Sequence, residues 1–537
     1  MTRTDARSPV ANEAALPPHL GHVVISALCN QVVPHHLAGQ DAPADGREHA
    51  NKWLVLALSG AAAFMTTLDA SIVNISLPTI ARAFGVPVTG SLEWVLIGYL
   101  VVIAATLLSL GRLADMLGRK PIFLAGVALF GLGSALCGAA PTLVALIGAR
   151  LLQGLGAACI FAVNMAMVTQ AFPAAECGRA LGINAVLVAL GISTGPTVGG
   201  IITQYLSWRW IFYVNVPLAL VALLVAARAL TEGAPRQRPR FDPAGAALLA
   251  LGLTLLTLGL SVGEEWGWTS FRLLAVASLG AVALASALVV ESRVPSPVVD
   301  LKLLRNRVFA SANASFGLAM LALFAVGFLL PFYLEELRGL DTLQAGLLLT
   351  PMSVAVGVVA PVSGMLADRF GSRWLAPIGL LLACVGLVLL SQLDAASSDG
   401  DLVWRLLLTG VGQGLFMAPN TRAIMGAAPP GEQGIASSTL ATVRVIGQSL
   451  SVALGGAVFA SLGGAAAGTT LATQRAALTP EEVTALQRTF TTGLHAALLV
   501  SAAVAACGVL AALVRGEEDL ARQEPPASSG EPVRSQT

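Results

Sequence analysis

Fourteen apolar segments, each about as long as a membrane-crossing helix, dominate this chain of 537 residues. A helix needs roughly 20 mostly apolar residues to cross the hydrocarbon core of a bilayer. Charged residues make up only 11% of the chain, too few to cover a water-soluble surface, since about 25% is usual in soluble proteins. We therefore expect an all-α integral membrane protein with 14 transmembrane helices. The segments lie near residues 53–79, 92–112, 121–140, 143–171, 179–204, 210–230, 243–262, 271–291, 309–333, 343–366, 374–393, 402–427, 434–463 and 490–514.

The lysines and arginines predict the orientation of these helices, because cytoplasmic loops carry an excess of them. If the N-terminus is cytoplasmic, the cytoplasmic segments hold 22 of the 31 basic residues and the outer loops hold seven. Basic residues near the ends of predicted spans are counted with the adjoining loops, and only Arg150 and Arg444 then remain within spans. We expect a multi-pass protein of the inner (cytoplasmic) membrane with both termini in the cytoplasm. The net charge of +1 argues against a nucleic-acid partner.

A ten-residue motif occurs in similar form in two predicted cytoplasmic loops. GRLADMLGRK at 111–120 is repeated as GMLADRFGSR at 364–373, with five identical positions. A weaker match joins the Gly-x-Gly of residues 154–156 and Asn164 to the Gly-x-Gly of residues 410–412 and Asn420. The offsets of 253 and 256 residues correspond to eight predicted spans. Repeated bundles are common in secondary transporters, so we expect two six-helix bundles with two additional helices inserted between them.

This repeat divides the chain into five parts. The expected parts are a disordered cytoplasmic tail over residues 1–52, an N-terminal six-helix bundle over 53–230, an insertion with spans 7 and 8 and cytoplasmic linkers over 231–308, a C-terminal six-helix bundle over 309–515, and a cytoplasmic tail over 516–537.

Several motifs resemble signatures of one family, the major facilitator superfamily. Residues 111–120 resemble its loop signature between the second and third helices, and residues 146–159 resemble its fourth-helix signature. GISTGPTVGG at 191–200 is similar to its fifth-helix antiporter signature. LDASIVNISLP at 68–78 and WRWIFYVNVP at 208–217 resemble segments of its drug:proton antiporters. The resemblance covers about residues 53–515, and together with 14 spans it points to the EmrB/QacA-like branch.

Asp69 is the most informative single residue, because it is the only acidic residue that we place deep within a span. Glu93 and Glu335 are among those placed at helix ends or in loops. A charged side chain inside the membrane is costly and therefore a functional candidate. The resemblance implies that Asp69 couples transport to protons together with Arg150, which matches the family's fourth-helix arginine. The alternatives are a structural aspartate near a helix end and an arginine that reaches the outer interface.

Two groups of residues are expected to control the movement of the bundles. Small residues at four-residue spacing allow two helices to approach closely, and a proline bends a helix. The resemblance implies that the antiporter motif forms a tight, bent seam between the bundles that blocks leakage. The acidic and basic loop residues are expected to form a gating contact that exists in one conformation only, although they could simply follow the positive-inside rule. The antiporter-motif residues are Gly191, Gly195, Pro196, Gly199 and Gly200. The gating-loop residues are Gly111, Asp115, Gly118, Arg119, Lys120, Asp368, Arg369 and Arg373. Further candidates are Asn74, Gln153 and Arg444.

The resemblance implies proton-coupled efflux of a hydrophobic drug or antibiotic that confers resistance. The chain contains no phosphate-binding, hydrolase or zinc motif, so we expect no enzyme activity, no cofactor and no metal site. The expected partners are a hydrophobic small molecule, protons and the lipid bilayer, with the protein acting as a monomer. The Ala-, Gly- and Arg-rich composition, with three lysines, is typical of a GC-rich genome such as that of an actinomycete, which favours a self-produced aromatic polyketide. The alternatives are an exporter or facilitator of a dedicated metabolite or lipid and, more remotely, a non-transporting membrane receptor.

Overall fold

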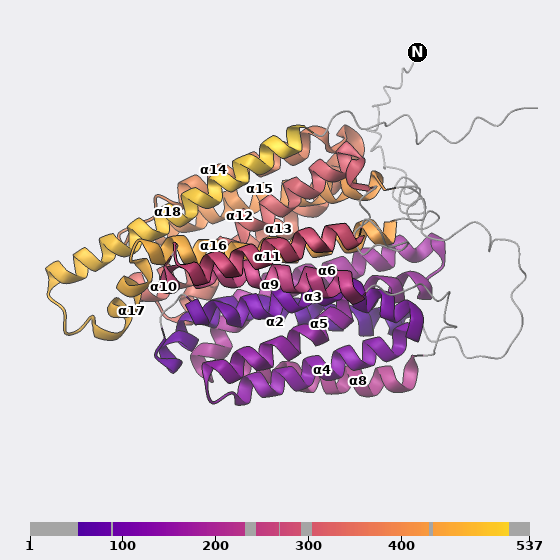
Figure 1. The fold of residues 1–537 in the computed structure, drawn as a ribbon, viewed down its shortest axis with the longest axis horizontal. Coiled ribbons are helices and arrows are strands. Elements are labelled where there is room, and N and C mark those ends of the chain that lie inside the picture. The colour runs from indigo at the N-terminus through magenta and orange to yellow at the C-terminus, as the bar shows by residue number, and fades with distance from the viewer. Residues whose placement is uncertain are drawn as a thin grey trace, which may run out of the picture.

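The computed structural model describes residues 52–86, 90–230, 243–267, 269–291, 303–428 and 433–514 (Figure 1). These residues form helices and their connections, and no strand occurs among them. The two expected tails, apart from Lys52, lie outside the described residues, and so do the first expected linker of the insertion and the second one up to residue 302.

Each of the fourteen predicted segments lies on a described helix. The first six correspond to α2 (Lys52–Phe84), α3 (Trp94–Leu117), α4 (Arg119–Ala139), α5 (Leu143–Ala171), α6 (Ala174–Tyr205) and the pair α7 (Trp210–Tyr213) and α8 (Asn215–Ala229). The next two correspond to α9 (Pro243–Ser261) and α11 (Phe271–Glu291), joined through α10 (Gly263–Trp266). The last six correspond to α12 (Arg307–Phe332), α13 (Thr342–Phe370), α14 (Ser372–Leu390), α15 (Asp399–Gly426), α16 (Gln433–Ser461) and α18 (Pro480–Leu513).

Shorter elements flank these helices. They are η2 (Gly90–Glu93), η3 (Leu303–Arg305), the π-helical turn η4 (Tyr333–Leu337) that continues α12, and α17 (Gly464–Gln474). Eleven helical segments of the described chain are long and apolar enough to cross a membrane, and α9 and α11 contain shorter apolar stretches. The expected all-α membrane fold is confirmed, and the number of 14 spans stays a prediction.

The helices form two groups that lie side by side (Figure 1). In the first group α2 packs on α5, α6 and α8, and α4 packs on α5 and α8. In the second group α12 packs on α15, α16 and α18, and α14 packs on α15 and α18. The seam between the groups is formed mainly by α6 with α13, α3 with α16, and α2 with α12. The inserted helices α9 and α11 pair with each other, and α9 also contacts α3 and α16, so the insertion covers one side of this seam.

Glycines of the weaker repeat occupy equivalent positions in the two groups. A side chain at Gly156 of α5 would meet the backbone of α4 at Phe130, and one at Gly412 of α15 would meet the backbone of α14 at Ala383. Close backbone approach of this kind is the usual reason for small residues between membrane helices. The repeated glycines therefore fix the same helix contact in both halves.

The repeated asparagines make the same hydrogen bond in both halves. The Nδ2 atom of Asn164 donates to the Ser59 carbonyl of α2 over 2.7 Å, and that of Asn420 donates to the Ala312 carbonyl of α12 over 3.0 Å. Ser59 and Ala312 are 253 residues apart, the offset of the loop repeat. The two halves of the chain thus repeat one helix arrangement, with α2 equivalent to α12 and α5 equivalent to α15.

Reporter fusions test the predicted orientation of these helices. Fusions after Gly233 and Gln523 should report the cytoplasm, and a fusion after Ala466, at the start of α17, should report the outside. A phosphatase reporter active only outside and a fluorescent reporter active only inside provide matched readouts at each position. A cytoplasmic signal at Ala466 would overturn both the orientation and the number of 14 spans.

Candidate functional site

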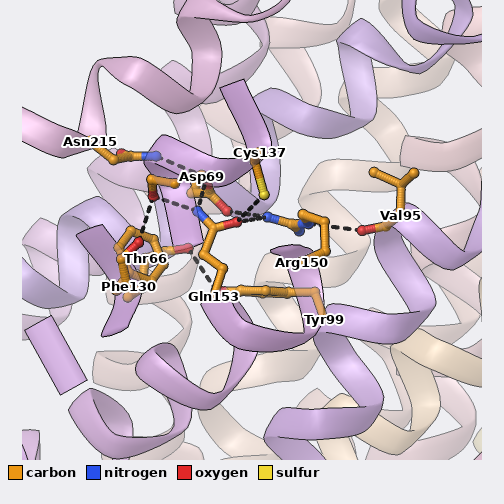
Figure 2. Close-up of polar contacts among 10 residues, drawn as sticks. Thr66, Asp69, Val95, Tyr99, Phe130, Cys137, Arg150, Gln153 and Asn215 are labelled. Atoms are coloured by element: carbon orange, nitrogen blue, oxygen red, sulfur yellow. Dashed lines mark hydrogen bonds and ion pairs between the residues drawn. The ribbon is translucent and has the colours of Figure 1, made fainter. Parts of the chain in front are cut away.

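Four helices of the first group bring polar side chains together in its interior (Figure 2). Asp69 lies on α2, and Arg150 and Gln153 lie three residues apart on α5, a spacing that places both on one face of the helix. Asn215 is the first residue of α8, and Ser134 lies on α4. All five residues are buried. We call them the Asp69 cluster.

The carboxylate of Asp69 accepts three hydrogen bonds. Its Oδ2 atom lies 2.6 Å from Nη1 of Arg150, in a fully buried ion pair. Its Oδ1 atom accepts from Nε2 of Gln153 and from Nδ2 of Asn215, each at 2.9 Å. A carboxylate that loses its water must find donors of this kind. Three donors from two other helices of the cluster therefore converge on this one carboxylate.

The guanidinium of Arg150 is held by contacts on three sides. Its Nε donates to the Val95 carbonyl over 2.9 Å, and its Nη1 also donates to Oε1 of Gln153 over 2.6 Å. The guanidinium lies over the ring of Tyr99, 4.1 Å from the ring centroid, a cation–π contact. Gln153 then donates to the hydroxyl of Ser134 over 2.8 Å. Removing one partner of a buried ion pair typically costs about 3–5 kcal/mol, so these residues act as one unit.

The second half of the chain shows that the fold itself does not need this cluster. By the repeat, Asp69 corresponds to Ala322, and Arg150 corresponds to Leu406; both counterparts are apolar and fully buried. Gln153 corresponds to Thr409, because Gly133 of α4 abuts Gln153 and Gly386 of α14 abuts Thr409. The same helix arrangement is thus built with and without buried charges. Since buried ion pairs are weak evidence for stability, the Asp69 cluster is a candidate functional site.

Two members of the cluster, Asn215 and Ser134, are not among the site residues predicted from the sequence. Asn215 belongs to the segment 208–217 that resembles drug:proton antiporters, and an asparagine at the start of an apolar helix was the available signal. Ser134 carries no such signal, because serine is common in membrane helices. Both reach the cluster only through the packing of α4 and α8 against α5 and α2.

The glycines of the antiporter motif face two different neighbours. Gly191, Gly195 and Gly199 lie directly against α2, where a side chain would meet Thr67, Ser71 and Ile75. Gly200 lies against the backbone of α13 at Thr342, in the other group of helices, and Gly346 of α13 lies against the Pro196 carbonyl. The motif therefore packs α6 within its own group and, through Pro196 and Gly200, across the seam.

Further contacts hold this seam together beside the motif. The hydroxyls of Thr197 and Thr350 are 2.6 Å apart, and Ser193 donates to the Ser353 carbonyl over 3.2 Å. All four residues lie where α6 and α13 cross, so the seam is closed between these two helices in the structure.

The repeated loops lie at equivalent helix junctions. Gly118 separates α3 from α4 with φ +98°, and Gly371 separates α13 from α14 with φ +78°, backbone angles that favour glycine. Arg119 donates to the Ala166 carbonyl of α5 over 2.6 Å, and Arg373 lies over the ring of Trp374. Gly111 lies in α3 and Lys120 is the second residue of α4. The side chains of Asp115, Asp368 and Arg369 lie outside the described residues, so the gating role of the loops stays a prediction.

The other candidates lie at separate places. Asn74 of α2 faces Gly327 of α12 across the seam, and its Oδ1 atom is buried without a hydrogen bond from the described residues. Arg444 of α16 lies over the Phe316 ring of α12, 5.7 Å from the centroid, and its Nε atom is also without such a bond. Neither residue joins the Asp69 cluster.

Two acidic residues that were expected at helix ends or in loops are buried there. Glu93 lies in η2 at the start of α3, Glu335 lies in η4 at the end of α12, and both are buried, as is Glu336. The apolar runs end close to these residues, and the sequence shows no partner for them. Their burial results from packing against helices distant in sequence, since Glu93 lies against Gly456 of α16 and Glu336 against Gly468 of α17.

Comparison with known proteins gives relatives that transport drugs and other solutes. The chain is 36% identical over 409 residues to the multidrug resistance protein Stp of Mycobacterium tuberculosis, covering 76% of each chain. It is 35% identical over 411 residues to the riboflavin transporter RibZ of Clostridioides difficile, covering 76% of this chain and 88% of the relative. It is 31% identical over 425 residues to the tetracenomycin C resistance and export protein of Streptomyces glaucescens, covering 78% of each.

The fold is also found among solved structures. A bacterial homolog of the human lysosomal transporter Spinster superposes with a TM-score of 0.61 at 15% identity, covering 88% of this chain and 98% of that chain. At this identity the likeness concerns the fold alone. The family model of the Major Facilitator Superfamily matches residues 60–452 and, in an overlapping second match, residues 313–535. The chain therefore belongs to the major facilitator superfamily, a family of membrane transporters and not of enzymes.

Proposed function

We propose that this transporter exports a hydrophobic drug or antibiotic across the cytoplasmic membrane in exchange for protons. The observation that carries the proposal is the Asp69 cluster, a buried charge network in the first half whose counterparts in the second half are apolar or uncharged. The proposal includes a monomer with both termini in the cytoplasm, in which the bundles over residues 53–230 and 309–515 move against each other around the insertion over residues 231–308.

The chemistry of the cluster fits proton exchange. Protonation of Asp69 removes the charge that holds Nη1 of Arg150 and the amide donors of Gln153 and Asn215. The proton and these donors compete for the same two oxygens, so the cluster has different arrangements with and without the proton. An element with two arrangements, one of them favoured by a bound proton, can bias which way a transporter faces.

The membrane potential supplies enough energy for such an exchange. One proton moving down about 100 mV yields roughly 2.3 kcal/mol. That is enough to concentrate a neutral solute by almost two orders of magnitude, since each tenfold ratio requires about 1.4 kcal/mol. A single titrating carboxylate is therefore sufficient for useful export.

The nature of the substrate is proposed from the relatives and from the spans. Two relatives are named for multidrug resistance and for resistance to and export of tetracenomycin C, which supports a drug or antibiotic, including a self-produced aromatic polyketide. The part of α13 between Leu343 and Leu366 contains no acidic residue. This favours a neutral, aromatic or weakly ionised compound over a permanently charged cation.

A second candidate function is transport of one dedicated metabolite. The relative RibZ is named a riboflavin transporter and is as similar to this chain as the multidrug protein Stp. A dedicated carrier would act on one compound and would give its host no resistance to unrelated drugs.

Two measurements test export and separate these candidates. Expression in an efflux-deficient bacterium should raise the inhibitory concentration of several hydrophobic compounds, and inverted vesicles should accumulate the same compounds when energised. The Asp69→Asn chain, matched in expression, serves as the uncoupled control, which should neither raise the inhibitory concentrations nor accumulate drug. A chain that changes no drug susceptibility but moves riboflavin would support the dedicated carrier and contradict drug export.

The loop junctions give a separate prediction about gating. Asp115→Ala should strongly reduce transport while expression stays near normal, because it removes a carboxylate expected to form a contact in one conformation only. Asp115→Glu, which keeps the charge, should restore part of the transport rate in the same vesicles. Transport by Asp115→Ala at the wild-type rate would show that these charges only orient the helices.

A further inference from the structure

Two consecutive acidic residues are buried at the end of the bundle that is predicted to face outside, here called the outer end. Glu335 and Glu336 lie in η4, the turn that continues α12, and are only 7% and 3% exposed. The last residues of α12 before this turn are apolar. Two carboxylates therefore enter the protein interior together at a point remote from the Asp69 cluster in sequence.

The first carboxylate joins the two halves of the protein. Arg82, in the last turn of α2, forms an ion pair through its Nη2 atom with Oε2 of Glu335. The hydroxyl of Thr79 donates to the same oxygen over 3.4 Å and lies 3.4 Å from the hydroxyl of Thr342 of α13. Because α2 and η4 belong to different halves, this ion pair exists only while the outer end is closed. We call it the outer latch.

The second carboxylate has no such partner. None of the described residues donates a hydrogen bond to Glu336 or forms an ion pair with it, and its Oε2 atom is shielded from solvent. Gly468 of α17 lies directly against that oxygen, and the ring of Phe490 of α18 lies beside the same glycine. The surroundings of Glu336 are therefore apolar on the side of α17 and α18.

The charges that face Glu336 do not balance it. They are Arg82 from α2 and Glu335 from η4, with Asp341 at the start of α13 adding a further negative charge near Glu335. After Arg307 at its first position, α12 contains no charged residue, and neither does α17. Two buried carboxylates thus share one guanidinium, and the ionised form of the second is strongly disfavoured by the loss of water.

We propose that Glu336 is a second proton-binding site, at which a proton from the external water binds as the outer end closes. When the halves separate at this end, Arg82 moves away and water reaches both carboxylates. When the halves close, Arg82 neutralises the charge of Glu335, and a proton binds to a carboxylate oxygen of Glu336. The proton returns to the same water on reopening, so it drives no export but makes closure depend on external pH. This goes beyond the proposed function, which concerns Asp69.

The test measures closure directly, without drug and in an Asp69→Asn background, so that it does not depend on export. Spin labels replace Leu206 at the end of α6 and Ala396 after α14, which are exposed positions in different halves at the outer end. Pulsed distance measurements then give the ratio of closed to open molecules as pH is varied. With one proton taken up on closure, this ratio should rise about tenfold for each unit of acidification over the range in which Glu336 titrates.

The proposal predicts how the closed-to-open ratio depends on pH in two variants and in one control. Glu336→Gln closes without a proton, so its ratio should not change with pH in this range. Arg82→Gln leaves both carboxylates without a cation, so closure should take up two protons and the ratio should change about a hundredfold for each pH unit. Glu481→Gln removes an exposed acidic residue at the start of α18 and serves as the matched control, which should behave like the parent.

The outcomes decide the proposal even if one variant does not fold. If Glu336→Gln cannot be purified, Glu335→Gln replaces it: Arg82 and Glu336 then balance each other, and the pH dependence should again be lost. An unchanged slope in either variant, or a slope in Arg82→Gln no steeper than the parent's, would contradict a proton at Glu336. A ratio that follows sodium or magnesium concentration at constant pH would assign the site to a metal cation and overturn the proposal.

Discussion

Asp69→Asn should abolish uphill drug accumulation while leaving downhill drug movement in place. In energised inverted vesicles the parent chain should concentrate a neutral drug by up to almost two orders of magnitude at about 100 mV, and the variant should not exceed equilibrium. Asparagine has nearly the size of aspartate, and its oxygen can still accept from Gln153 or Asn215. It cannot bind and release a proton, so only the coupling is removed.

The control for this substitution lies in the same cluster. Ser134→Ala removes the hydrogen bond at the far side of Gln153 and no titrating group, so it should lower the rate and keep uphill accumulation. Thermal unfolding of both variants separates a loss of coupling from a loss of folded protein, since Asp69→Asn leaves the charge of Arg150 buried without its anion. Protonophore-sensitive accumulation by Asp69→Asn would place the coupling site elsewhere.

Gly200→Val should hold the outer end open and largely stop transport. A Cβ atom at Gly200 would lie 2.8 Å from the Thr342 carbonyl oxygen and 3.0 Å from the Leu343 Cα atom, both on the backbone of α13. Overpacking of this kind costs about 1–3 kcal/mol, and it is felt only when the seam closes. The ratio of closed to open molecules should therefore fall roughly 5- to 150-fold.

The neighbouring glycine provides the matched control. Gly199 lies against the side chain of Ile75 within the same half, so Gly199→Ala should affect the stability of that half and not the seam. Labelling of a cysteine placed at Thr350 by a membrane-impermeant thiol reagent, with the native cysteines replaced, reports an open outer end. A Gly200→Val chain that keeps this cysteine protected and transports normally would contradict a closed seam at α6 and α13.

The helices of this protein could be predicted from its sequence because lipid imposes a simple length and composition on each span. The repeat was also visible, since close helix contacts in both halves require glycine at Gly156 and Gly412. The rule for length and composition does not predict where each helix begins and ends. The last span was expected from residue 490, but α18 begins at Pro480 with Thr479 as its cap, because a polar first turn can extend a membrane helix beyond the bilayer.

The partners within the site could not be predicted in the same way. Asp69, Arg150 and Gln153 were candidates because charged and amide groups are rare in apolar spans, but their contacts with Asn215 and Ser134 depend on how four helices pack. The ion pair between Arg82 and Glu335 joins residues 253 positions apart. Sequence patterns indicate which face of a helix is polar. Which polar faces come into contact depends on the tertiary packing of the helices.

Drug-driven proton movement in liposomes tests the central claim most directly. The purified protein is reconstituted, a gradient of an established drug substrate is imposed with no membrane potential, and the internal pH is recorded. The account predicts proton movement opposite to the drug in the parent and in Ser134→Ala. It predicts none in Asp69→Asn, although that variant still exchanges labelled for unlabelled drug. Proton movement by Asp69→Asn at the parent's rate would contradict coupling through the Asp69 cluster.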